Sequence, residues 1–190
     1  YSSQEGVVGD ISIAERNLLG RGQFLRLRAS LSSLRKQFDF RFTEPYFLDR
    51  NLAAGFDIYN ITSTYDESSY EATTTGGGLR LGFPLSEFSR LGLRYTLRSD
   101  EITAFSDASD FVKDLEGTFL TSVVGFDYVF DNRDDPIAPK EGFLISFSAD
   151  LAGLGGDVKY YRTEADAIGT GSAERPVEMG MRTCQKGDRV

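Results

Sequence analysis

The stretch Phe130-Asp-Asn-Arg-Asp-Asp-Pro-Ile-Ala-Pro-Lys-Glu-Gly-Phe143 decides the fold class of this chain. On either side of it apolar residues recur at every second position, as in Phe126 and Tyr128 before it and Ile145 and Phe147 after it. A period of two is that of a β-strand with two different faces, and two prolines and a glycine favour a turn between strands. The stretch therefore predicts a β-hairpin.

The same alternation extends along most of the chain. Leu25 and Leu27 alternate with Arg26 and Arg28, so that one face of the predicted strand is apolar and the other is charged. No comparable stripe appears at helical spacing. We predict an all-β, antiparallel fold with about eight or nine strands over residues 1–167.

Composition limits the function classes. The chain has 190 residues, 15 Phe, 9 Tyr and a net charge of -8, which argues against a nucleic-acid partner. It has no apolar run of roughly 18 residues, which excludes a transmembrane helix but not barrel strands of about 10 half-polar residues. Histidine is absent, and with it the usual general base and the commonest zinc ligand. We therefore predict a protein that is not an enzyme and has no cofactor.

The acidic residues of the opening stretch could suggest a calcium loop. The spacing does not fit, because Arg133 stands where a ligand is needed and the required glycine is missing. We instead expect the Asp and Asn side chains to cap the backbone of the turn, while Pro139 and Gly142 set its dihedral angles. The sequence predicts no metal site.

The charged faces of the strands leave two architectures open. They could be the solvent face of a soluble sandwich or the wet interior of a barrel, where charges pair across strands. The many Phe residues favour the barrel, since its outer face would turn them toward lipid.

Four blocks of sequence resemble the BamA family of outer-membrane protein assembly factors, the bacterial surface antigen or POTRA-barrel family. They are Gly9-Asp-Ile-Ser-Ile-Ala-Glu-Arg-Asn-Leu-Leu-Gly-Arg-Gly-Gln23, Phe42-Thr-Glu-Pro-Tyr-Phe-Leu-Asp49, Leu81-Gly-Phe-Pro-Leu85 and the opening turn. Their order and spacing make the resemblance specific, and it extends from about Val7 to Ala167.

The resemblance implies a transmembrane β-barrel of about 16 strands in the bacterial outer membrane, of which residues 1–167 would be the N-terminal half. Such a protein folds and inserts other barrel proteins. Its implied partners are unfolded outer-membrane proteins as substrates, outer-membrane lipids and accessory assembly lipoproteins.

The resemblance also implies two sites. The first strand would be the lateral gate, whose free edge pairs with an incoming strand, and the turn would be a family motif. The implied gate residues are Val8, Asp10, Ile11, Ser12, Ile13 and Ala14, and the implied motif residues are Asp131, Arg133, Asp134, Pro139 and Gly142.

The end of the chain follows a different pattern. Residues 168–190 lose the alternation, and we predict a tail that is either irregular or not homologous to the barrel. Alternatives to an assembly factor are a related polypeptide-translocating barrel, TamA-like or of the two-partner secretion type, and a passive porin. A hydrolase is disfavoured by the absent histidine.

Overall fold

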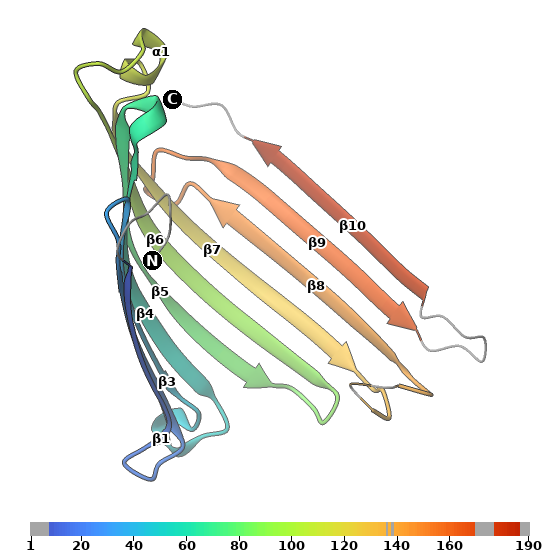
Figure 1. Ribbon diagram of the computed structural model, residues 1–190. Helices are drawn as coiled ribbons and strands as arrows, with labels where there is room; N and C mark the ends of the chain where they lie inside the picture. The colour runs from blue at the N-terminus through green and yellow to red at the C-terminus, as the bar shows by residue number, and fades with distance from the viewer. Residues whose placement is uncertain (1–7, 136, 138, 170–176, 187–190) are drawn as a thin grey trace.

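The chain folds into one antiparallel sheet whose strands follow one another in sequence order (Figure 1). This computed structural model describes residues 8–135, 137, 139–169 and 177–186. The strands are β1 (Gly9–Leu18), β2 (Gln23–Leu31), β3 (Arg35–Glu44), β4 (Ala53–Tyr65), β5 (Tyr70–Pro84), β6 (Ser89–Ala104), β7 (Gly117–Asp131), β8 (Phe143–Ala152), β9 (Tyr160–Gly169) and β10 (Val177–Lys186). The all-β, antiparallel prediction is confirmed.

The sheet is curved and open. In Figure 1 the strands β1 to β4 are seen nearly edge-on, whereas β7 to β10 are seen face-on. Within the described part of the chain, β1 pairs only with β2 and β10 only with β9, so each is an edge of the sheet.

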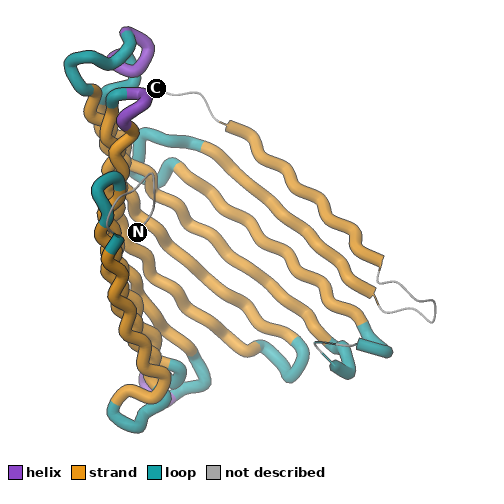
Figure 2. The backbone as a smooth tube through the Cα atoms, viewed as in Figure 1, coloured by secondary structure: helices purple, strands orange, loops and turns teal. Residues whose placement is uncertain are grey.

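Among the described residues, helical structure is limited to single turns in the connections between strands (Figure 2). They are η1 (Phe47–Asp49), η2 (Asp66–Ser68) and α1 (Asp110–Lys113). In the part of the chain that is described, none of these helices has the length or the apolar character needed to cross a membrane.

One face of the sheet is apolar and uncovered. Across β3 and β4 the rings of Phe42 and Phe56 lie 5.8 Å apart, and across β7 and β8 those of Phe126 and Phe147 lie 5.6 Å apart. Yet Phe56 and Phe126 are exposed, and the only buried hydrophobic residues among those described are Ala108 and Ala152. A soluble sandwich would bury this face in a core, so the single layer contradicts that alternative.

Strands β1 to β9 agree with the predicted eight or nine, and the structure differs from the prediction at the end of the chain. Val177–Lys186 forms β10, paired residue by residue with β9, where an irregular or non-homologous tail was predicted. These ten residues are therefore not irregular, because strand addition needs only backbone groups and no apolar alternation. The remaining residues of the predicted segment beyond Gly169 lie outside the described part.

Strand β6 continues past the acidic residues Asp100 and Glu101 to Ala104, which is in register with Tyr70 at the start of β5. Pairing with β5 therefore keeps this acidic stretch in the sheet.

Candidate functional site

The first candidate site is the edge strand β1. Its residues pair with β2 in the register Ile11 to Ala29 and Ile13 to Leu27, which places both isoleucines on the apolar face, where they are exposed. Asp10, Ser12 and Ala14 lie on the polar face, and Asp10 forms an ion pair of 3.2 Å with Arg28 of β2.

The other edge of β1 has no partner among the described residues, so its backbone N–H and C=O groups on that side are available for pairing. Five of the six implied gate residues lie in this strand. Val8 lies just before it.

The second candidate site is the connection between β7 and β8. Arg133 forms two parallel bonds with Asp131 at the end of β7, each of 2.8 Å, through Nε and Nη2. The backbone N–H groups of Lys140 and Glu141 donate to Asp134 Oδ1 at 2.9 and 3.1 Å.

These hydrogen bonds give the turn its shape. The bonds from Glu141 and Lys140 hold the pKa of the Asp134 carboxyl below its usual range, and the bond to Asp131 raises the pKa of Arg133. Gly142 has a φ of 99°, a conformation that favours glycine. The predicted capping of the turn is thus confirmed, and the motif residues Asp131, Arg133 and Asp134 have structural contacts.

A network of ion pairs crosses the polar face from β6 to β9. Arg94 donates through Nη1 to Asp127 at 2.9 Å and through Nη2 to Asp150 at 2.7 Å. Arg162 donates to the other oxygen of Asp150 at 2.7 Å. Asp150 is almost buried, with 7% of its side chain exposed, so both of its oxygens are shielded by the two guanidinium groups.

Glycines leave the space in which these long side chains lie flat on the sheet. A Cβ at Gly125 would collide with Asp150 Oδ1 and would lie 2.8 Å from Arg94 Nε. A Cβ at Gly76 would lie 2.7 Å from the hydroxyl of Tyr59. These contacts depend on the register between strands, so the sequence alone does not show them.

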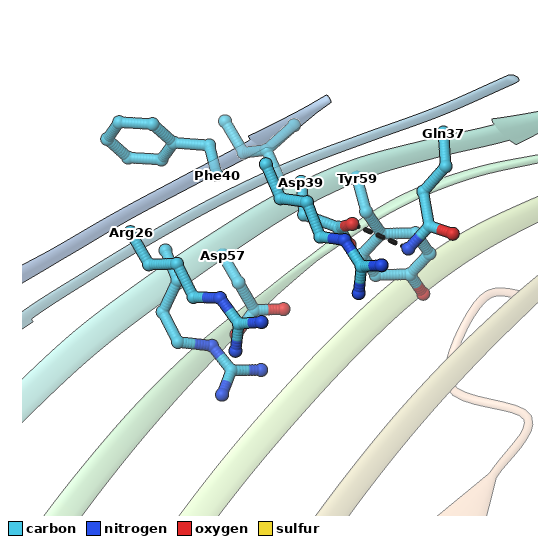
Figure 3. A pocket seen from close by; sticks show the side chains of 9 residues that line it. Arg26, Gln37, Asp39, Phe40, Asp57 and Tyr59 are labelled. Carbon is cyan, nitrogen blue, oxygen red and sulfur yellow. Dashed lines mark hydrogen bonds between the residues drawn. The ribbon is translucent and has the colours of Figure 1, made fainter. Parts of the chain in front are cut away.

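A cavity of about 220 Å³ opens on the polar face over β2, β3 and β4 (Figure 3). It is lined by Arg26, Arg28, Gln37, Asp39, Phe40, Arg41, Asp57, Ile58 and Tyr59. In Figure 3 the side chain of Gln37 points toward Asp39, to which its Nε2 donates at 2.6 Å.

Sequence reasoning placed these charged residues on one face of the strands but could not find the ion pairs or the cavity. Alternation identifies the face of a residue, whereas the pairs depend on the register between strands. Register cannot be read from a single strand.

Comparison with known proteins gives one family. A model of the Omp85 superfamily domain matches residues 17–174. The outer membrane protein assembly factor BamA of Neorickettsia risticii is 29% identical over 171 residues, which are 89% of this chain and 23% of that protein. BamA of Nitratidesulfovibrio vulgaris is 32% identical over 157 residues, which are 81% of this chain and 19% of that protein.

A eukaryotic relative and a solved structure are also similar. The SAM50-like protein CG7639 of Drosophila melanogaster is 28% identical over 159 residues, which are 78% of this chain and 35% of that protein. The crystal structure of BamA from Haemophilus ducreyi lacking POTRA domains 1-3 has a TM-score of 0.62 at 21% identity, over 87% of this chain and 35% of that one. The likeness shows the fold, a partial β-barrel. The chain spans about a fifth to a quarter of the length of the two bacterial relatives.

Proposed function

The chain belongs to the Omp85 superfamily, and from this premise we propose that it acts within an assembly factor that folds and inserts other barrel proteins by strand pairing at β1. The resemblance to BamA is confirmed, and the chain is an outer-membrane protein of that kind. Its bacterial relatives are named assembly factors, and the proposed activity needs no catalytic residue.

The free edge of β1 is the observation that supports this mechanism. An unpaired edge presents a row of backbone donors and acceptors to which another strand can add. In a bilayer each backbone group left without a partner costs several kcal/mol. Pairing of a client strand with this edge therefore lowers the free energy more than the same pairing would in water. Nine of the ten residues of β1 are exposed, so few neighbouring residues would have to move before a client strand could pair with it.

The proposed partners follow from this mechanism. Unfolded outer-membrane proteins would supply the incoming strand, and lipid would contact the apolar face. Accessory lipoproteins would bind the whole assembly factor, and the turn from Asp131 to Gly142 would stand at one end of the barrel wall as a family motif.

Disulfide trapping tests the gate. Because Cys184 is the only cysteine, Cys184→Ala gives a cysteine-free background into which Ser12→Cys is introduced. A client barrel protein with a cysteine in its last strand should form a disulfide with Cys at position 12 during assembly, because paired strands bring Cβ atoms within bonding distance.

The matched control is Thr96→Cys, in the interior strand β6, which is paired on both sides. We expect trapping at position 12 and none at position 96. Equal trapping at the two positions, or none at either, would contradict pairing at β1.

A further inference from the structure

Two arginines on the polar face stand directly opposite each other. Arg26 of β2 and Arg41 of β3 are register partners, and both are exposed. Neither forms a hydrogen bond or an ion pair with any residue in the described part of the chain. Like charges directly opposite in a sheet are destabilising, and the carboxylate that stands opposite Arg41 on its other side is Asp57 of β4.

The acidic groups of the cavity are already engaged. Asp57 Oδ1 lies 3.2 Å from Arg80 Nε, and the Asp39 carboxylate accepts from Gln37. Arg80 itself has no aligned hydrogen bond from Nε or Nη2 among the described residues. The β2–β5 side of the polar face therefore has more guanidinium groups than carboxylates available to bind them.

The opposite side of the same face shows the contrast. There Arg94 and Arg162 share Asp150, and Arg94 also reaches Asp127. These two arginines over β6–β9 are thus neutralised by ion pairs, whereas Arg26 of β2 and Arg41 of β3 have no ion pair in the described part of the chain.

We propose that the cavity at Arg26 and Arg41 binds the carboxylate of an Asp or Glu side chain from a polypeptide that enters the interior of the barrel. Guanidinium groups bind carboxylates through paired, charge-assisted hydrogen bonds. A volume of about 220 Å³ accommodates such a group. The inference rests on the proposed function, because the polypeptide that would contact the polar face is a client of the assembly factor.

The position of the cavity favours a polypeptide over a lipid headgroup. Arg26 lies three residues inside the start of β2 and Arg41 three residues inside the end of β3. At about 3.3 Å per residue, the two arginines lie roughly 10 Å from the strand ends, where headgroups lie.

The test uses the intact protein in detergent micelles and a ¹⁹F-labelled pentapeptide, blocked at both ends, whose only charge is one Glu. Binding is followed by broadening of the ¹⁹F signal. We expect the peptide to bind, its Glu→Gln counterpart to bind at least about tenfold more weakly, and the Arg26→Gln, Arg41→Gln double variant to lose about tenfold in affinity. Circular dichroism should show an intact sheet, since the double change removes a repulsion.

The control is Arg50→Gln, an exposed arginine in the turn before β4, which should bind the Glu peptide like the wild type. Absence of binding to the wild type, or binding by the double variant within twofold of it, would overturn the proposal. So would full displacement by inorganic phosphate at the concentration of the peptide. Disulfide trapping at position 12 does not depend on these arginines, so the two proposals can fail separately.

Discussion

Substitution of Asp150 by Asn should destabilise the sheet more than the same change at Asp127, the other carboxylate bound by Arg94. Asp150 Oδ1 accepts from Arg94 Nε at 3.0 Å and Nη2 at 2.7 Å, and Oδ2 accepts from Arg162 Nε at 3.2 Å and Nη2 at 2.7 Å. Asn keeps the shape of the side chain. It removes the charge and turns an N–H₂ group toward one of the two arginines.

The size of the destabilisation follows from these contacts and from the exposure of the two arginine side chains. A hydrogen bond to a charged group contributes about 1.5–3 kcal/mol, which would give a large sum for four donors. The arginine side chains are, however, 30% and 50% exposed, so water solvates them once the carboxylate is lost. With that screening we expect the free energy of unfolding to fall by about 2 kcal/mol.

The matched control is Asp127→Asn. Asp127 is 45% exposed and accepts one bond of 2.9 Å from Arg94, so its loss should cost less than about 1 kcal/mol. Urea titration in detergent micelles, followed by the β-sheet circular dichroism signal, measures both, since the chain has no tryptophan to report by fluorescence. If Asp150→Asn lowers the free energy of unfolding no more than Asp127→Asn does, the ion-pair network does not stabilise the sheet.

Two further predictions concern the glycines and the turn. Gly125→Ala should lower the free energy of unfolding by about 1–3 kcal/mol in the same titration, because the added Cβ would collide with Asp150. The control is Gly82→Ala, where the atom nearest to the added Cβ is Ala53 Cβ at 3.6 Å. Equal effects of the two changes would refute the packing argument. For Asp134, whose folded pKa is lowered, the stabilisation is present above the unfolded pKa of about 3.9 and is lost as pH falls through the folded value. We therefore expect the difference in unfolding free energy between wild type and Asp134→Asn to shrink as the pH is lowered from 6 to 2. A constant difference would contradict the stabilising role of the Asp134 carboxylate.

The sequence was sufficient for the strands because their signal is local. Alternation at Phe38, Phe40 and Phe42 identifies a strand and its two faces without knowledge of any partner. The turn was predictable for the same reason, since Asp134 and Gly142 act on backbone groups within a few residues of themselves.

What the sequence could not provide depends on neighbours in space. The Arg94 to Asp150 pair joins residues 56 apart in the chain, and β10 forms against the backbone of β9 without an apolar pattern. The two glycines Gly76 and Gly125 look alike in sequence. Only the register shows that one lies under Tyr59 and the other under Asp150.

The order of the sheet, in which every described strand pairs only with its neighbours in sequence, has a consequence for folding. Each new strand needs a single hairpin closure onto an edge that already exists, so the contact order stays low for a β-protein of this size. The sheet can therefore grow as a one-dimensional array, in which stability accumulates strand by strand and the loss of a terminal strand leaves the register of the others unchanged.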